Sequence, residues 1–299
     1  MKAFLRSITI CSLFCATSLF GEMVEPPNGD SIDALGFEFT AEGTYIGGGD
    51  VKRGSDKIND IDEVNTLVRF LIMPRTAVGI LRLGAEWDRY DFDVSNSVFL
   101  PDVVQAVALV IGLDTKFSDS LLFRIEATPG FYGTDDLDGE GFNVPFIAGG
   151  TYLYSSTLQF VFGVGVNYES EFPVLPGGGV RWKFAPQWVL NAVLPTPRLE
   201  YEWTRNLVVY AGADLRSKTV RTDENFGSDR GNSRFNNAIL TYTEVRAGVG
   251  LLWKIGESCR LSIEGGYLPY RNFDYHRVDI GYKSDGGAPY GSLSFRSSF

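Results

Sequence analysis

Long segments of this sequence alternate between apolar and polar residues with a period of two. In GILRLGAEWDRY (79–90), Leu81, Leu83 and Trp87 fall on one side of an extended chain, and charged residues fall on the other. The same alternation recurs in LGFEFTAEGTY (35–45), LLFRIEAT (121–128), TEVRAGVGLLW (243–253) and RLSIEGGY (260–267). Side chains of a strand point alternately to its two faces, so the pattern predicts β-strands with one apolar face rather than helices.

Two architectures carry such strands. In a soluble sandwich, the apolar faces pack inward and the polar faces meet water. In a transmembrane barrel, the apolar faces meet lipid and the polar faces line the lumen. Alternating segments such as 77–91, 207–222 and 238–255 are longer than ordinary strands. Their length suits a tilted membrane span with extensions and favours the barrel.

The connections between segments differ in length in a regular way. Short turns are predicted at 74–76, 118–119, 155–156, 185–187, 204–206 and 256–257, and longer polar connections at 47–60, 133–141 and 223–237. Short periplasmic turns and longer outer loops are typical of outer-membrane barrels.

The tryptophans lie beside the short turns. Trp182 and Trp188 flank one turn, and Trp203 and Trp253 each precede another. Alternation places all four on the apolar face, so we expect them to form an aromatic girdle at one membrane interface.

Both ends of the chain carry signals of export. Lys2 and Arg6 precede an apolar run that ends at Gly21, which predicts a cleavable signal peptide over 1–21. We then expect a short periplasmic segment at 22–34 and a barrel at 35–299. The final alternating strand ends at Phe299 and resembles the sorting signal of bacterial outer-membrane barrels, except that Ser297 takes an apolar position. Phe299 is therefore predicted to be an assembly signal.

Composition excludes several classes of protein. The formal net charge is −10, and removal of Lys2 and Arg6 with the signal peptide would lower it by two. This balance argues against nucleic acid as a partner, because phosphate binding needs clustered basic residues. Cys259 alone would remain after cleavage, so an internal disulfide is not expected. The predicted partners are outer-membrane lipid, the barrel-assembly machinery and small solutes of a Gram-negative cell envelope.

The strand number is predicted as twelve to fourteen, in an all-β antiparallel transmembrane barrel. An even number follows if both termini face the periplasm. Two segments leave the count open. Pro195 and Pro197 either form the tip of a hairpin or kink one long strand. Residues 273–287 form either another strand or an outer loop.

The C-terminal half also resembles a known family. The matching features lie in 176–215 and 242–255 and are Pro176, Trp188, the run Pro195-Thr196-Pro197-Arg198, Tyr201, Leu207, the run Tyr210-Ala211-Gly212, Tyr242, Glu244, Arg246, Gly248 and Gly250. They resemble an uncharacterised family of predicted bacterial outer-membrane proteins, classed only as a domain of unknown function. The resemblance implies a barrel and no established activity.

Alternation also predicts which charged residues face the lumen. They are Arg82, Glu86, Asp88, Arg124, Glu126, Arg198, Glu200, Glu202, Asp214, Arg216, Lys218, Glu244, Arg246, Arg260 and Glu264. Opposite charges on neighbouring strands attract one another. The set indicates either a narrow polar pore or ion pairs that brace a nearly closed barrel. We therefore expect a small passive, porin-like channel or a structural membrane protein. Acidic outer loops predict a mild preference for cations at low salt.

Catalytic signals are few, and no enzymatic activity, cofactor or metal is predicted. His276 is the only histidine, and an outer-membrane enzyme working at its rim with Asp274 or Asp279 is one alternative. A soluble secreted β-protein is another. Asp136, Asp138 and Glu140 partly resemble a calcium loop, but the later bidentate Glu is missing, so a solvated outer loop is expected.

Overall fold

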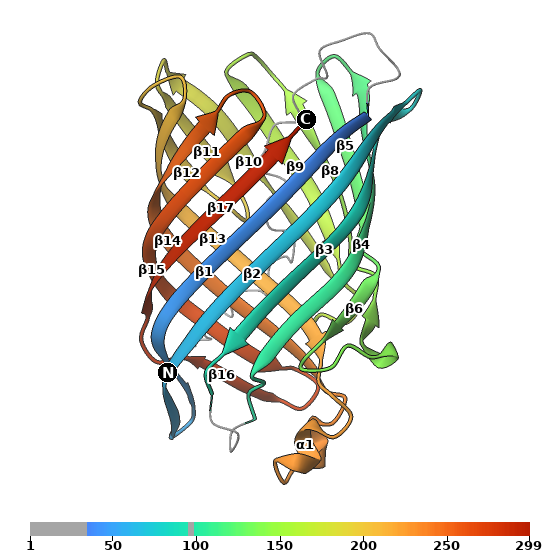
Figure 1. The fold of residues 1–299 in the computed structure, drawn as a ribbon, viewed down its shortest axis with the longest axis vertical. Helices are drawn as coiled ribbons and strands as arrows, with labels where there is room; N and C mark the ends of the chain where they lie inside the picture. Colours follow the sequence, from blue (N-terminus) through green and yellow to red (C-terminus); the bar gives the residue numbers. More distant parts are fainter. Residues whose placement is uncertain (1–34, 95–98) are drawn as a thin grey trace, which may run out of the picture.

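The alternating segments form the wall of one closed antiparallel β-barrel (Figure 1). The computed structural model describes residues 35–94 and 99–299. The predicted signal peptide and the segment 22–34 lie outside the described residues. No helix among the described residues is long and apolar enough to cross a membrane.

The strands of the wall follow the chain order. They are β1 (Leu35–Arg53), β2 (Asp56–Thr76), β3 (Gly79–Phe92), β4 (Val103–Ser118), β5 (Leu121–Ala127), β6 (Gly130–Gly133), β7 (Phe142–Asn143), β8 (Phe146–Leu153), β9 (Leu158–Val166), β10 (Val174–Ala185), β11 (Trp188–Val193), β12 (Arg198–Glu202), β13 (Leu207–Arg221), β14 (Ile239–Ile255), β15 (Cys259–Tyr275), β16 (Ile280–Ser284) and β17 (Ala288–Ser298). A short helix, α1 (Phe226–Asp229), lies between β13 and β14.

Three positions in the wall are shared by two successive short strands. β5 and β6 both pair with β4 on one side. On their other side, β5 pairs with β8 and β6 pairs with β7. β16 and β17 both pair with β15 and with β1. The wall therefore has fourteen strand positions. This confirms the predicted antiparallel barrel of twelve to fourteen strands, whereas the inward-packed sandwich is not formed.

The barrel closes between its first and last strands. β1 pairs with β2 on one edge and with β17 on the other. The N–H of Phe37 donates to the carbonyl of Phe299 at 2.6 Å, and the N–H of Phe299 donates back at 3.0 Å. Leu35 and Phe299 thus lie at the same rim, and that this rim faces the periplasm stays a prediction.

The two ambiguous segments are hairpins. Pro195-Thr196-Pro197 joins β11 to β12, and Asn191 pairs with Arg198 across it. Residues 273–287 contain the end of β15, a tight turn and β16. Proline cannot donate to a strand ladder, which explains why both strands stop at the proline pair.

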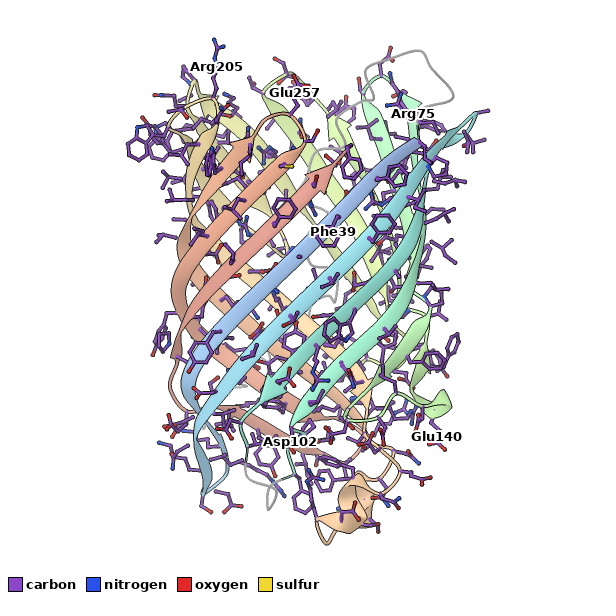
Figure 2. All side chains as sticks on the ribbon, viewed as in Figure 1. Phe39, Arg75, Asp102, Glu140, Arg205 and Glu257 are labelled. Carbon is purple, nitrogen blue, oxygen red and sulfur yellow. The ribbon has the colours of Figure 1, made fainter. Side chains whose placement is uncertain are left out.

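The two rims differ as the sequence predicts, with one exception. Figure 2 places Arg75, Arg205 and Glu257 of the short turns at one rim, and Asp102 and Glu140 at the other. We call these the short-turn rim and the loop rim. The predicted long connection at 47–60 is wrong, because β1 and β2 continue through it to a two-residue turn.

That extended hairpin is held by its own contacts. Val51 is fully buried against the barrel end, and Lys57 lies 2.8 Å from the carboxylate of Asp50. Gly54 takes a φ of 59°, a left-handed conformation that favours glycine in a tight turn. The polar composition of 47–60 therefore predicted a loop in a segment where β1 and β2 remain paired.

The exterior of the barrel is apolar. Leu109, Val249 and Ile263 are more than half exposed, and neighbouring strands present similar residues outward. Exposed apolar surface on this scale is unfavourable in water and suits a hydrocarbon environment.

The interior changes along the axis because the strands differ in length. A buried apolar cluster fills the loop end, and its strand residues come from β1–β4, β6 and β13–β16. Among the described residues, β8–β12 contribute nothing to it. β13 approaches β6 there, where Arg221 pairs with Gly133 in parallel. These nine strands are close to the roughly eight that enclose only enough space for side chains, so this end is a packed core rather than an open lumen.

Candidate functional site: a charged lumen with a cavity toward the short-turn rim

Two layers of buried charge lie on the inner face of the barrel wall. In the first layer, Glu126 of β5 accepts from Arg69 of β2 at 2.6 Å and from Arg82 of β3 at 3.1 Å. Arg124 donates to both carboxylate oxygens of Asp114 through Nε and Nη2, at 2.5 and 2.7 Å. Glu126 is 2% exposed. Each carboxylate therefore compensates a buried guanidinium, which would otherwise carry a large desolvation cost.

The second layer lies on β13, β14 and β1. Arg216 contacts Glu42 at 2.5 Å and Asp214 at 2.7 Å, and Arg246 contacts Glu244 at 2.6 Å. Arg216 and Asp214, like Arg246 and Glu244, are two residues apart on one face of a strand, and across the β13–β14 ladder Asp214 stands opposite Arg246 and Arg216 opposite Glu244. Opposite charges placed directly across a ladder stabilise it.

Further ion pairs lie between the second layer and the packed loop end. Lys218 lies 2.6 Å from Asp88, and Arg271 lies 2.9 Å from Glu63. The hydroxyl of Tyr242 donates to Glu63 at 2.5 Å. The lumen is therefore occupied by paired side chains from its middle to the loop rim.

Several of these residues were not anticipated from the sequence. Glu42, Glu63, Asn65, Arg69, Asp114 and Arg271 belong to the buried network but were not among the predicted lumen residues. Glu42 is a missed application of the alternation rule, since 35–45 already placed it on the polar face. On β2 the pattern is blurred, because Leu67 and Leu71 also face inward and are buried.

A cavity of about 330 Å³ remains in the short-turn half of the lumen. The predicted residues Arg198, Glu200, Glu202, Asp214, Arg216, Arg246, Arg260 and Glu264 all line it, together with Glu42, Arg181, Lys254 and Arg296. Arg181 contacts Glu200 at 3.2 Å, Lys183 contacts Glu202 at 2.5 Å, and Arg198 lies 3.9 Å from Glu264. Arg198 also stacks over the ring of Tyr210 at 4.6 Å.

The remaining predicted lumen residues lie in the first layer, in the second layer (Glu244) or above it. Glu86 contacts Arg69 at 3.2 Å, and Asp88 bonds Asn65 as well as Lys218. A ring of charges of one sign would select ions by charge alone. The structure instead places the predicted charges in separate groups that contain both signs.

The four tryptophans lie on the outer surface near the short-turn rim. Trp182, Trp188, Trp203 and Trp253 are each between 39% and 61% exposed. The rings of Trp188 and Tyr201 lie 4.8 Å apart, and Phe184 lies between Trp182 and Trp188. Phe299 is also exposed, with its ring 5.7 Å from that of Phe37. The hydroxyl of Ser297 lies 3.4 Å from the thiol of Cys259 on the adjacent strand.

The loop rim contains the two remaining candidates. His276 lies in the turn after β15, and its buried Nδ1 has no hydrogen-bond partner among the described residues. Burial, followed by the charge of Arg277, lowers the pKa of His276 below its ordinary value. Asp138 caps a short 3₁₀ turn by accepting from the N–H groups of Glu140 and Gly141. Over residues 35–94 and 99–299, no group of three or more metal-ligating side chains is formed.

The chain matches one protein family in sequence and several solved barrels in structure. The model of a family described as Domain of unknown function (DUF6268) matches residues 81–282. The chain is similar to the crystal structure of an outer membrane channel from Pseudomonas putida F1, at a TM-score of 0.50 and 11% identity, over 93% of this chain and 100% of that one. That likeness shows that the two chains share a β-barrel fold.

Two further solved structures are similar at lower scores. One is a Pseudomonas aeruginosa FadL homologue, at a TM-score of 0.39 and 10% identity, over 89% of this chain and 90% of that one. The other is the P. putida toluene transporter TodX, at a TM-score of 0.38 and 9% identity, over 92% of this chain and 91% of that one. No curated protein sequence matches the chain.

Proposed function

The chain belongs to the DUF6268 family, and from this premise we propose that it is a small passive channel of the bacterial outer membrane. The observation that carries the proposal is the charged cavity in the short-turn half of a barrel with an apolar exterior. A polar, partly open lumen inside a lipid-facing wall is what solute passage across a membrane requires. Outer-membrane lipid and the barrel-assembly machinery are its proposed partners, and export by a cleavable signal peptide is part of the proposal.

The conformation described here is a closed state of that channel. Phe226 and Phe235, both in the segment between β13 and β14, insert into the apolar cluster at the loop end and are buried. The ring of Phe235 stacks on Phe99 at 4.4 Å and meets Tyr275 edge-on at 5.0 Å. We name residues 222–238 the plug segment, and opening requires its displacement from the barrel end.

A structural, non-conducting barrel is the second candidate. The buried ion pairs, such as Lys218 with Asp88, favour it because they tie β13 to β3 across the lumen. No observation favours catalysis at His276, where no hydroxyl or carboxylate among the described residues bonds Nδ1.

Conductance separates the two candidates. The full chain would be refolded in detergent and inserted into a planar lipid bilayer. A channel gives discrete openings, rare in the parent protein and more frequent in the double variant Phe226→Ala, Phe235→Ala, because apolar contacts that hold the plug segment are lost. The control is Phe142→Ala, an exposed aromatic of β7 outside the cluster. Folded, heat-modifiable protein that never conducts, in the parent and in the double variant alike, would overturn the channel and leave the structural barrel.

A further inference from the structure

Two ion pairs beside the cavity lie along the barrel wall instead of crossing the lumen. Arg181 of β10 contacts Glu200 of β12 at 3.2 Å, and Lys183 of β10 contacts Glu202 of β12 at 2.5 Å. β11 lies between these strands, and strands two apart in a sheet are separated by roughly 10 Å. The side chains of each pair therefore lean over β11 to meet, which leaves the lumen beside them open.

Two tyrosines follow the cavity wall in the same way. A Cβ atom added to Gly250 would lie 2.4 Å from the ring of Tyr210, and one added to Gly248 would lie 2.4 Å from the hydroxyl of Tyr290. That hydroxyl donates to Glu264 at 2.5 Å. Glycine at these two positions of β14 therefore makes room for tyrosine side chains that lie against the wall, and both tyrosines line the cavity of about 330 Å³.

The ion pairs that line the cavity remain within reach of a solute. The side chains of Arg181 and Glu200 are 23% and 18% exposed. Those of Arg198 and Glu264, which lie 3.9 Å apart, are 33% and 16% exposed. The second layer, by contrast, is buried and forms the inner end of the cavity. A solute in the cavity thus meets charged groups that already have partners.

Such pairs suit hydroxyl groups better than ions. A guanidinium has more N–H groups, and a carboxylate more lone pairs, than one ion pair uses. A solute hydroxyl can donate to the carboxylate and accept from the guanidinium while the ion pair stays intact. A charged solute must instead displace one partner, which leaves a charge in the wall without compensation. The wall therefore favours an uncharged solute with several hydroxyl groups.

Serine side chains on β15 and β17 extend this hydrogen-bonding surface. Ser262 stands opposite Ser294, and Glu264 stands opposite Ser292, across the β15–β17 ladder, and all four line the cavity. Each serine hydroxyl can donate as well as accept. These short side chains also leave space, and the volume of about 330 Å³ lies near the lower end of the roughly 300–1,000 Å³ that small-molecule sites occupy. Space of this size suits a solute of one sugar ring.

We infer that the cavity is a binding site for a small uncharged polyol of about the size of one sugar ring. The inference rests on the proposed function and deepens it, because it names the solute class of that channel. Glu202 lines the cavity and is the last residue of β12 before the short turn, so the entrance lies at the short-turn rim.

Glucose is the probe, and its binding is measured by saturation-transfer difference NMR. The full chain is refolded in a detergent without a sugar headgroup, so that the detergent does not occupy the site. The signal of glucose should saturate as its concentration rises. The double variant Glu200→Gln, Glu202→Gln should weaken binding by about tenfold or more, because hydrogen bonds to charged acceptors are lost.

The matched control is Glu257→Gln. Glu257 lies in an exposed turn of the same rim and does not line the cavity (Figure 2). Its variant should bind glucose with the affinity of the parent. Sulfate at the same concentration as glucose should leave the signal unchanged, because the ion pairs do not open for an anion.

Folding of the double variant is checked by its heat-modifiable mobility on gels. If it does not fold, Ser294→Phe replaces it, because this change fills the cavity without altering its charge and should abolish the glucose signal. Three results would each overturn the inference. They are the absence of a saturable glucose signal in the parent, equal affinity in the parent and the altered cavity, and displacement of glucose by sulfate.

Planar bilayers distinguish this inference from the proposed function. In a conducting parent protein, glucose should lower the current in a saturable manner. Conductance without glucose binding would remove the site and leave the channel. Glucose binding without any conductance would retain the site and remove the channel.

Discussion

Arg82 Nε of β3 lies 3.1 Å from Glu126 Oε2 of β5, across the strand that separates them in the wall. The other oxygen of Glu126 accepts from Arg69 of β2. One carboxylate with 2% exposure thus neutralises two buried guanidinium groups from the adjacent strands β2 and β3. The contact is a brace of the barrel as well as a constriction of its lumen.

Replacement of Glu126 by Gln should destabilise the barrel by about 3–5 kcal/mol, because it leaves buried positive charge without compensation. Denaturant unfolding in detergent, followed by tryptophan fluorescence, measures the change. Glu257→Gln in an exposed turn is the control and should lie within about 0.5 kcal/mol of the parent. A loss below about 1 kcal/mol for the Glu126 variant would show that water reaches the site and compensates the arginines.

Much of the wall could be predicted because one physical rule governs it. Leu81, Leu83 and Trp87 alternate with Arg82 and Glu86 since one face meets an apolar medium and the other does not. The sequence left open whether Pro195 and Pro197 form a hairpin tip or kink one strand. A hairpin forms because proline has no N–H to donate to a strand ladder. Strand existence therefore follows from short-range pattern.

The interior could be predicted only in part, because it depends on contacts between distant segments. Leu71 faces inward and is fully buried, since a filled lumen also accepts apolar side chains, and this hides Arg69 from an alternation rule. Phe226 and Phe235 sit in a polar segment that reads as a loop, yet they pack in the barrel end. That packing requires β8–β12 to stop short of the loop rim, which is a property of the assembled wall.

The outward face of β4 tests the membrane assignment. Leu109 lies near the middle of this strand and is 58% exposed. Leu109→Arg should cost about 2–4 kcal/mol of unfolding free energy in lipid vesicles, because a charge enters the hydrocarbon centre. Val78→Arg, in the turn between β2 and β3, should cost about 0–1 kcal/mol. Equal costs at the two sites would contradict a lipid-facing β4.

Phe299 separates assembly from stability. The residue is 70% exposed, and its main chain holds β1 through two hydrogen bonds that alanine would keep. Phe299→Ala should therefore leave the unfolding free energy of refolded protein within about 1 kcal/mol of the parent. If the ring is recognised during assembly, the same variant should lower the fraction of folded barrel recovered from outer membranes. Unchanged recovery would remove the assembly role.

His276 should make stability depend on pH at the loop rim. Its folded-state pKa is lowered from 6.5, first by burial and then by Arg277, against the opposing charges of Asp274 and Glu171. The unfolded chain then binds more protons than the folded chain in this window, so stability is lost as the pH falls from about 6.5 through the folded-state pKa. The melting temperature of the parent protein should therefore drop between pH 7.5 and pH 5.5 by more than that of His276→Gln.

The turn that contains His276 follows Tyr275, whose ring contacts Phe235 of the plug segment. Protonation in this turn should therefore loosen the plug segment before the rest of the barrel. Limited proteolysis at pH 5.5 should cleave within 222–238 faster in the parent than in His276→Gln, with equal rates at pH 7.5. Equal cleavage rates of the parent and His276→Gln at both pH values would show that protonation of the histidine does not affect the plug segment. A higher melting temperature of the parent at pH 5.5 than at pH 7.5 would contradict the predicted loss of stability on protonation.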